Sequence, residues 1–484
     1  MQSYDLLVKN ADIATAGDRY HADIAIAGGR IVAIGRDLAG SATETIDAAG
    51  RLVTPGGVDG HVHLDQPTSD GSVFADDFFT GTRSAACGGT TTVIPFAAQQ
   101  KGHSLQAAVD DYHVKADGRA VIDYAFHLIV SDATPTVTRE ELPRLIEAGY
   151  TSLKLYMTYD DLKLDDRQII EVLATSRRFG AMTMIHAENS DCIGWLTEQL
   201  LAAGLSAPNY HGSSRPMVIE REATHRAIAL SELLDTPILI VHVSGQEAVE
   251  QIHWARGRGL PIYAETCPQY LFLSAEDLLP QGGDMAHGMR CICSPPPRDK
   301  SNQQAIWNGL ASGLFSIVSS DHAPFNYHGP QGKRVAGEHA AFNQVPNGIP
   351  GVETRLPLLM SEGVLGGRID IHRFVELTST NPARLYGLYP KKGTLAVGSD
   401  ADLVIWSMFA AGQEKTLSHS MLHSACDYTP YEGRSLRCWP AHTLSRGRTV
   451  WRDGVFSGGA GDGQFLPCLK PRTPNAGSPL AKWL

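Results

Sequence analysis

The sequence predicts an α/β fold: a (β/α)8 TIM-like barrel plus a small β-sandwich domain built from both chain ends. In the middle of the chain, short apolar runs alternate about eight times with helix-length amphipathic stretches, as strands and crossover helices do. These runs are nearly continuously apolar, which is typical of parallel strands covered on both faces. Both ends instead alternate apolar and polar residues, which is typical of half-buried antiparallel sheet.

The alternating pattern fills the first fifty residues and returns near the end of the chain. In ADIAIAGGRIVAIG, the pair Gly28 and Gly29 separates two apolar runs and predicts a hairpin turn. The later copies are GTLAVGSDADLVIW and AHTLSRGRTVWRDG. We therefore expect residues 1–54 and 389–460 to form one β-sandwich domain, with residues 461–484 as a C-terminal arm.

The predicted barrel occupies residues 55–388. Segments such as DRQIIEVLATSRRFG place apolar residues at helical spacing and end in Gly, a common helix stop. An open doubly wound sheet is the alternative, but no G-x-G-x-x-G opens the first helix. The strands are expected in RLVTPGGVDGHVH and in residues 90–97, 123–133, 151–157, 181–188, 237–244, 261–267 and 315–323.

Composition narrows the class of protein. The 484 residues carry a formal net charge of −11, which gives no basic footprint for nucleic acid or anionic lipid. No window approaches the roughly 20 apolar residues that a membrane span needs, and the N-terminus lacks the features of a signal peptide. The eight cysteines form no recurring C-x-x-C pairs, so we expect reduced thiols in a cytoplasmic enzyme. A small neutral ligand is the expected partner.

Polar side chains interrupt the apolar runs where the predicted strands end. His61 and His63 lie two positions apart, so in an extended strand their side chains share a face. A lone histidine at a strand end is more often a hydrogen-bonded core residue than a metal ligand. A barrel, however, keeps its chemistry at the C-terminal ends of its strands. The pattern therefore predicts that these histidines converge with Lys154, His186, His242 and Asp321.

Imidazole and carboxylate ligands without sulfur favour Zn²⁺, with Mn²⁺, Fe²⁺ or Co²⁺ as alternatives. Four imidazoles and one carboxylate exceed what one catalytic ion needs if it keeps a position open for water, so we expect two ions. An ammonium beside two cations would be repelled. Lys154 can therefore stay near them only as a neutral amine or after conversion to an anion.

Ordered motifs along nearly the whole chain resemble those of the cyclic amidohydrolases of the amidohydrolase superfamily, most closely the dihydropyrimidinase and D-hydantoinase branch. The motifs are GGVDGHVHLD, TSLKLYMTY, MIHAEN, IVHVS, CSPP, SSDHAPF, VPNGIPGVETR and GTLAVGSDADLVIW. The resemblance implies hydrolytic ring opening of 5,6-dihydropyrimidines or 5-substituted hydantoins to N-carbamoyl amino acids. It also implies a homotetramer.

The resemblance further implies a role for each site residue. His61, His63 and Asp321 would hold the more buried Zn²⁺, and His186 and His242 the more exposed one. Lys154, carboxylated by carbon dioxide to N6-carboxylysine, would bridge the two ions. Asp321 would move the proton, the Tyr159 phenol would stabilise the developing oxyanion, and the backbones at Ser294 and Asn347 would bind the ring.

Three alternatives remain open: an allantoinase, a cyclic imide hydrolase using the same centre, and a non-catalytic scaffold like the dihydropyrimidinase-related proteins. Retention of the full ligand set argues against the scaffold. Asp65 stands where dihydroorotase-like members have a carboxylate-gripping arginine, so we expect an anionic ring to be repelled. The loops near Thr68, Ser69, Tyr156 and Lys163 are more polar than the apolar lining typical of hydantoinases, which disfavours aromatic substituents.

Overall fold

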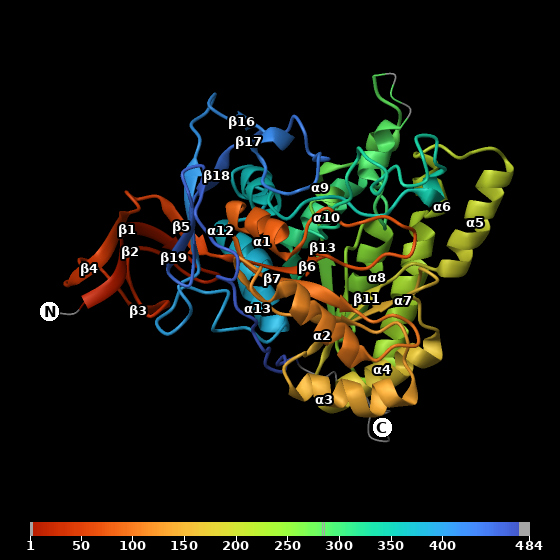
Figure 1. Cartoon of the computed structure of the whole chain (residues 1–484), viewed down its shortest axis with the longest axis horizontal. Helices are drawn as coiled ribbons and strands as arrows, with labels where there is room; N and C mark the ends of the chain where they lie inside the picture. Colours follow the sequence, from red (N-terminus) through yellow and green to blue (C-terminus); the bar gives the residue numbers. More distant parts are fainter. Residues whose placement is uncertain (1–2, 283, 285, 474–484) are drawn as a thin grey trace.

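Two sheets of different character organise the molecule (Figure 1). The structure is a computed structural model, and it describes residues 3–282, 284 and 286–473. One sheet contains parallel strands from the middle of the chain, and the other joins strands from both ends. The predicted fold class, a TIM-like barrel with a β domain built from the chain ends, is therefore confirmed.

Every predicted barrel run contains a strand of the parallel sheet. The first run is divided at Gly56, because its leading half, β5 (Leu52–Pro55), joins the other sheet. The strands are β6 (Gly57–Val62), β7 (Thr90–Ala98), β8 (Asp123–Tyr124), β9 (His127–Ile129), β10 (Ser152–Tyr156), β11 (Met182–His186), β12 (Ile238–Ile240), β13 (Ile262–Thr266) and β14 (Ile317–Val318).

Hydrogen bonds between the first and last strands join the ends of this sheet. Beyond β6, the His63 N–H donates to the His322 carbonyl at 2.7 Å, and the His322 N–H donates back to the His61 carbonyl at 3.3 Å. The two chain segments therefore run side by side. This pairing brings the H-x-H motif directly against Asp321.

A buried arginine reinforces the same seam. Arg355 is fully buried, and its Nε lies 3.1 Å from Asp59 Oδ2 on β6. Its guanidinium also donates to the Val318 carbonyl on β14 at 2.9 Å. Because both partners lie on the two strands that meet, this cation holds the seam of the barrel.

Helices cover the outside of the parallel sheet (Figure 1). α4 shows how the local sequence sets their ends: Asp165 and Gln168 form a capping box, and Gly180 ends the helix at a φ of 78°. The α-helices are α1 (Phe78–Cys87), α2 (Leu105–Ala116), α3 (Leu142–Glu147), α4 (Asp166–Phe179), α5 (Ser190–Ala202), α6 (Tyr210–Ser214), α7 (Met217–Leu234), α8 (Gln246–Gly257), α9 (Gln269–Phe272), α10 (Asn302–Ala311), α11 (Arg355–Leu358), α12 (Ile371–Val375) and α13 (Asn381–Leu385). None in the described part of the chain has both the length and the apolar character of a membrane span.

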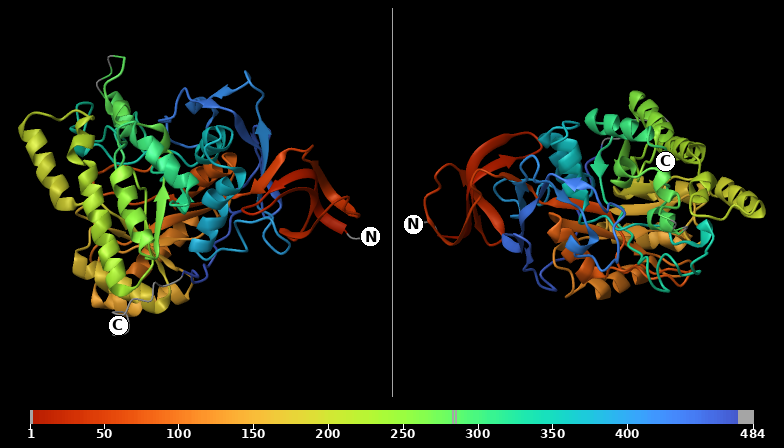
Figure 2. Two further views of the ribbon diagram at one scale, coloured as in Figure 1. Left: turned by 180° about the vertical axis from the view of Figure 1, so that it is seen from behind. Right: turned by 90° about the horizontal axis from the view of Figure 1, so that it is seen from above.

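The second sheet stands beside the barrel (Figure 2). The hairpin predicted at Gly28 and Gly29 is confirmed, because it joins β2 to β3 in antiparallel register. The sheet is mixed rather than wholly antiparallel, since β1 pairs in parallel with both β4 and β5. Its strands are β1 (Ser3–Ala14), β2 (Arg19–Ala27), β3 (Arg30–Gly35), β4 (Ser41–Asp47), β5, β15 (Leu403–Met408), β18 (Cys438–Ser445), β19 (Arg448–Arg452) and β20 (Val455–Phe456).

Apolar side chains from both chain ends share one core in this sheet. Val8 and Ile24 of the N-terminal strands belong to the same buried cluster as Leu403 and Leu444 of the C-terminal strands. The first fifty residues therefore depend on the last hundred for burial. A separate two-stranded sheet, β16 (Lys415–Thr416) with β17 (Ser435–Leu436), lies outside this sheet.

The described part of the predicted C-terminal arm packs on its own barrel. The Leu466 N–H donates to the Tyr124 carbonyl at 2.7 Å, and the Cys468 N–H donates to the Gly149 carbonyl at 2.9 Å. Leu466 and Cys468 are both buried. Residues 474–484 of the arm lie outside the described residues.

Candidate metal centre and substrate cavity

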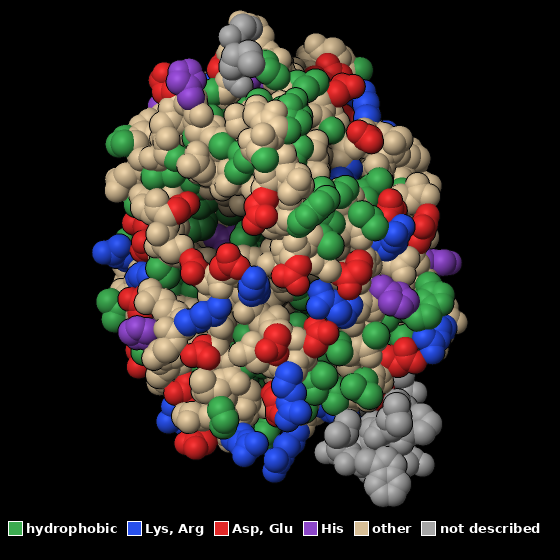
Figure 3. Space-filling view, turned by 90° about the vertical axis from the view of Figure 1, so that its right-hand side faces the viewer, with side chains coloured by type: hydrophobic (Ala, Val, Ile, Leu, Met, Phe, Trp, Pro, Cys, Tyr) green, Lys and Arg blue, Asp and Glu red, His purple; other side chains and the backbone are tan. Residues whose placement is uncertain are grey.

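A cavity of about 770 Å³ opens at the C-terminal ends of the barrel strands. Figure 3 shows a hollow with a histidine side chain inside it and acidic side chains around its rim. The structure brings together every site residue predicted from the sequence. The lining includes His61, His63, Lys154, Tyr159, His186, His242, Ser294, Asp321 and Asn347.

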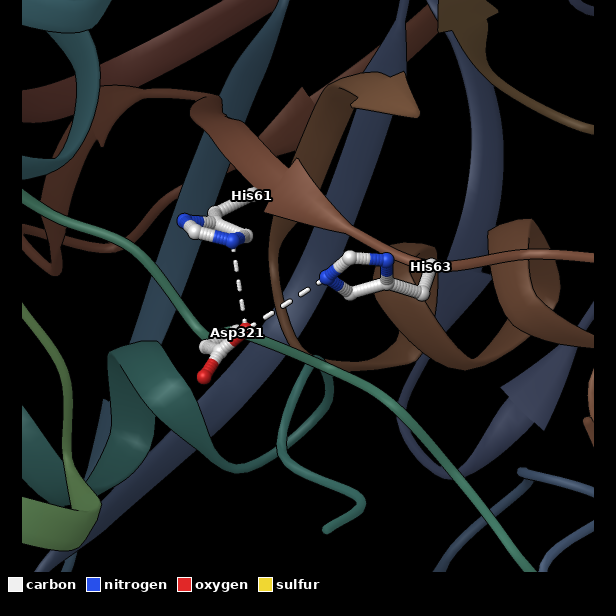
Figure 4. A group of neighbouring side chains, drawn as sticks. All are labelled: His61, His63 and Asp321. Carbon is white, nitrogen blue, oxygen red and sulfur yellow. Dashed lines mark ion pairs between the residues drawn. The ribbon is translucent and has the colours of Figure 1, made fainter. Parts of the chain in front are cut away.

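His61, His63 and Asp321 form a tight group in which both imidazoles point toward the carboxylate (Figure 4). Asp321 Oδ1 lies 3.2 Å from His61 Nε2 and 3.5 Å from His63 Nε2. The ligand atoms of the three residues lie within 4.8 Å of one another. These side chains therefore have the separation and chemistry of a metal-binding group.

The other three predicted ligands lie against this group. Lys154 is fully buried, and its Nζ is 3.2 Å from His61 Nε2. The ring of His242 lies 5.5 Å from that of His61 and 4.3 Å from that of His186, measured between centroids. Burial lowers the pKa of Lys154 below its ordinary value. A lowered pKa favours the neutral amine, one of the two forms in which Lys154 is expected to stay beside cations.

Carboxylate and amide side chains orient three of these histidines. Glu265 Oε1 lies 2.7 Å from His61 Nδ1, Gln66 Oε1 lies 2.7 Å from His63 Nδ1, and Glu188 Oε2 lies 2.7 Å from His186 Nε2. Such partners fix the ring orientation and leave the other nitrogen free for a metal. None of these three partners was predicted from the sequence. Glu265 ends an apolar run just as the histidines do, and this was the available signal.

The electrostatic environment favours neutral imidazoles, the form that binds a metal. Burial lowers the pKa of His61, His186 and His242 below the usual histidine value. The buried Nδ1 of His242 has no hydrogen-bond partner among the described residues. A buried nitrogen without a partner is costly unless a ligand satisfies it. The donor set therefore fits Zn²⁺ or a similar transition metal.

Strained backbone marks three residues of the cavity. Tyr159, His242 and Asp321 have φ values of 68°, 39° and 49°, in the left-handed region that favours glycine. Such strain persists only where surrounding contacts impose it, and it is concentrated at functional sites. Here the left-handed backbone occurs just after three strands, and all three residues line the same cavity.

Tyr159, Ser294 and Asn347 form the wall beside the histidines. The Tyr159 ring lies 5.3 Å from that of His186, and burial raises the pKa of Tyr159 to about 12, which keeps its phenol protonated. Ser294 Oγ donates to Asn347 Oδ1 at 3.0 Å. The backbone N–H groups of Ser294 and Asn347 donate no hydrogen bond within the described part of the chain. Both are therefore available to carbonyl groups of a ligand.

The mouth of the cavity is polar. Ser69 Oγ donates to Asp161 Oδ2 at 2.6 Å, and Lys101 Nζ donates to the Asp160 carbonyl at 2.6 Å, so the loops after β6, β7 and β10 are tied together. Thr68, Ser69 and Tyr156 line the cavity, whereas Lys163 pairs with Asp160 behind it.

Asp65 does not act as expected. It is not among the cavity-lining residues, and the loop turns there with a left-handed φ of 52°. Repulsion of an anionic ring by Asp65 is therefore not supported. Among the described residues that line the cavity, none is an arginine, so a substrate carboxylate would lack the bidentate partner.

A second group of ligand-type residues lies elsewhere and is already satisfied. It comprises Cys87, Glu353 and His423. Glu353 Oε1 lies 2.8 Å from His423 Nδ1, and its Oε2 accepts the Ser84 hydroxyl at 3.0 Å and the His423 N–H at 2.7 Å. Burial raises the pKa of the Cys87 thiol, which keeps it protonated. This cluster is read as a structural contact.

Comparison with known proteins places these features in a family. Residues 52–450 match the amidohydrolase family. The D-hydantoinases of Geobacillus stearothermophilus and Streptomyces coelicolor are 45% and 42% identical, over 96% and 95% of this chain and 96% and 97% of theirs. The crystal structure of dihydropyrimidinase from Brevibacillus agri has a TM-score of 0.93 at 43% identity, covering 97% of this chain and 99% of that one.

Proposed function

The chain belongs to the amidohydrolase family, and from this premise we propose that it opens cyclic diamides by hydrolysis to N-carbamoyl amino acids. The substrates are 5,6-dihydropyrimidines or 5-substituted hydantoins. The observation that carries the proposal is the convergence of His61, His63 and Asp321 with Lys154, His186 and His242 in one cavity. Its relatives named D-hydantoinase and dihydropyrimidinase match over nearly their whole length.

The proposed cofactor is a pair of Zn²⁺ ions, with Mn²⁺, Co²⁺ or Fe²⁺ as alternatives. His61, His63 and Asp321 would hold one ion, and His186 and His242 the other. Lys154 would bridge them as N6-carboxylysine, which forms when the amine adds carbon dioxide and releases a proton to leave an anionic carbamate. Bound in this way, the ions would supply a hydroxide nucleophile at neutral pH and polarise a ring carbonyl.

The chain's own residues then have separate tasks. The N–H groups of Ser294 and Asn347 orient the ring through its carbonyls. The Tyr159 phenol donates a hydrogen bond to the carbonyl oxygen as that oxygen gains negative charge. Asp321 accepts a proton and returns it to the departing ring nitrogen. Gln269 Nε2 donates to Asp321 Oδ2 at 3.3 Å and helps to hold that carboxylate.

The polar mouth favours one alternative activity. Allantoin is a hydantoin with a ureido substituent, whose N–H groups match the acceptors of Thr68, Ser69 and Asp161 at the mouth. An allantoinase reading is therefore the second candidate. A cyclic imide hydrolase would use the same centre, but no contact at the mouth favours it. If the protein were a non-catalytic scaffold, its complete set of metal-ligand residues would have no function.

A side-by-side substrate panel tests the proposal. Zinc-loaded protein is assayed for turnover of dihydrouracil, hydantoin, allantoin and succinimide, and the H61A variant controls for contaminating activity. We expect turnover of dihydrouracil or hydantoin that H61A abolishes. Inactivity on both rings rejects the leading proposal, and the active member of the remaining pair then identifies the reaction. A purified protein without bound transition metal would revive the scaffold reading.

We also propose a homotetramer. α5 contains no buried residue, although its sequence, SDCIGWLTEQLLA, is rich in apolar side chains. Trp195 on this helix is 61% exposed. Exposed apolar surface of this kind commonly marks an interface. Light scattering after gel filtration should report four copies for the wild type and fewer for W195E. V114E, at a side chain that is 79% exposed on α2, is the control and should leave the assembly intact.

The proposed location is the cytoplasm. Each of the eight cysteines is a free thiol, and seven of them are buried. Reduced thiols suit a reducing compartment. Localisation of a tagged chain by fractionation checks this, and recovery outside the cytoplasmic fraction would contradict it.

A further inference from the structure

The segment between Asp321 and Asn347 contains a buried lysine that the proposed reaction does not use. Lys333 has 0% exposure, and its Nζ donates to the carbonyls of Ile292 at 2.8 Å and Pro346 at 2.6 Å. No carboxylate pairs with it in the part of the chain that the structure describes. Burying a lysine amine costs free energy in either protonation state, so its presence here needs a reason.

The local backbone aims Lys333 inward. A Cβ on Gly332 would lie 1.8 Å from the Asn326 carbonyl oxygen, so only glycine allows the chain to pass this close. The next N–H, that of Lys333, donates to the same carbonyl at 2.7 Å. Gln331 accepts a hydrogen bond from the Val73 N–H at 2.8 Å, which anchors the segment to the loop at the cavity mouth.

The two carbonyls that Lys333 holds belong to the segments that carry the proposed ring-binding groups. Pro346 precedes Asn347 directly, and Ile292 precedes Ser294 by two positions. A peptide unit is planar and trans, so its N–H points opposite to its carbonyl. Because the Pro346 carbonyl faces Lys333, the Asn347 N–H faces away from it. That N–H donates no hydrogen bond within the described chain, and Asn347 lines the cavity.

Two further contacts join the same segments. The Gly348 N–H donates to the Ile292 carbonyl at 3.1 Å, and Ser294 Oγ donates to Asn347 Oδ1 at 3.0 Å. Neither contact engages the Pro346 carbonyl. Lys333 is therefore the contact that sets the orientation of the peptide unit between Pro346 and Asn347.

We propose that Lys333 is a positioning residue that holds the Ser294 and Asn347 backbones at the spacing of a cyclic amide. This proposal rests on the proposed function. The titratable groups that face Lys333 are the thiols of Cys291, Cys293 and Cys426, whose pKa values burial raises, and the Phe325 ring lies 5.8 Å away. Charged or neutral, the Lys333 amine has enough N–H groups for both carbonyls.

The test compares K333M, K333Q and R334M. K333M keeps much of the side-chain volume and removes the donors. K333Q retains an amide donor on a shorter chain and should reach only one carbonyl. R334M changes the neighbouring residue, whose guanidinium pairs with Glu338 at 3.1 Å and lies over the Tyr327 ring at 4.3 Å from its centroid.

Ring binding through these groups is shared by ground state and transition state, so its loss should raise KM with little change in kcat. We expect K333M to raise KM for the ring substrate at least about tenfold with kcat within about threefold. Its metal content should equal that of the wild type. K333Q should be intermediate, and R334M should match the wild type. A folded K333M with wild-type KM overturns the proposal, as does a loss confined to thermal stability. If K333M does not fold, wild-type KM in K333Q overturns it.

A second readout separates this proposal from the proposed function. Amide hydrogen exchange of residues 291–294 and 347–349, which carry backbone N–H groups, does not depend on turnover. We expect faster exchange in both segments for K333M and K333Q, and unchanged exchange for R334M. If the wild type opens no ring, the proposed function fails, while unchanged exchange in the folded Lys333 variants overturns the positioning role by itself.

Discussion

Glu265→Gln tests whether the metal centre depends on the carboxylate behind its histidines. Glu265 is fully buried, and its Oε1 accepts hydrogen bonds from His61 Nδ1 at 2.7 Å and from the His242 N–H at 3.1 Å. Burial raises the pKa of Glu265 to about 8, and cations held by the neighbouring histidines would favour its charged form. The substitution preserves size and one acceptor oxygen but removes that charge. Hydrogen bonds to charged groups contribute about 1.5–3 kcal/mol, against about 0.5–1.5 for neutral ones. The difference, about 1–1.5 kcal/mol, predicts roughly tenfold weaker metal binding.

The assay is competition for zinc between the protein and a chromophoric chelator. The zinc dissociation constant of E265Q should rise about tenfold, while kcat at saturating zinc should stay within a few fold of the wild type. E353Q is the matched control. Glu353 also accepts hydrogen bonds from a histidine Nδ1 and a backbone N–H, both from His423, but it lies outside the cavity.

Two results would refute this reasoning. The first is an unchanged zinc affinity in folded E265Q, which would show that the carboxylate does not tune the centre. The second is an equal weakening in E353Q, which would show that loss of any buried carboxylate loosens the fold enough to release metal. Equal losses of thermal stability in the two variants, with weaker zinc binding only in E265Q, would support the assignment.

The other predictions concern the reaction, the modification, the mouth and pH. Y159F should lower kcat by about 100-fold with little change in KM or metal content, measured by steady-state kinetics, because one oxyanion donor is lost. Lys154 should carry the mass of one carbon dioxide in native mass spectrometry, and K154M should lose both that mass and bound metal. Hydantoins with ureido or hydroxymethyl substituents should have higher kcat/KM than the phenyl compound, and the reverse order would contradict a polar mouth. Burial lowers the pKa of His211 to about 3 from 6.5, so stability should be full above pH 6.5 and fall progressively toward pH 3. The loss should reach several kcal/mol at about 1.4 kcal/mol per pKa unit, and H211N should show a flatter pH profile in chemical denaturation.

Much of the barrel and its candidate site was predictable because the signals are local. A strand that is covered on both faces appears in the sequence as an apolar run. A candidate metal-ligand residue at its end appears as a polar residue that interrupts the run. His186 ends β11, and His61 and His63 lie at the end of β6, as their positions in the sequence indicated. The position of the hairpin turn was equally predictable, because the glycine pair lies between β2 and β3.

Contacts between remote residues were decided only by the tertiary structure. Glu265 and His61 are 204 positions apart, and no local pattern indicates that one orients the other. Asp65 lies two positions after His63, yet it is not among the residues that line the cavity, and the backbone turns there with a left-handed φ of 52°. Lys333 lies in a segment without apolar periodicity. Its amine donates to the carbonyls of Ile292 and Pro346, which belong to two segments that lie far apart in the sequence. Periodicity records which face a residue presents, whereas the identity of its partner depends on how the closed barrel brings distant loops together.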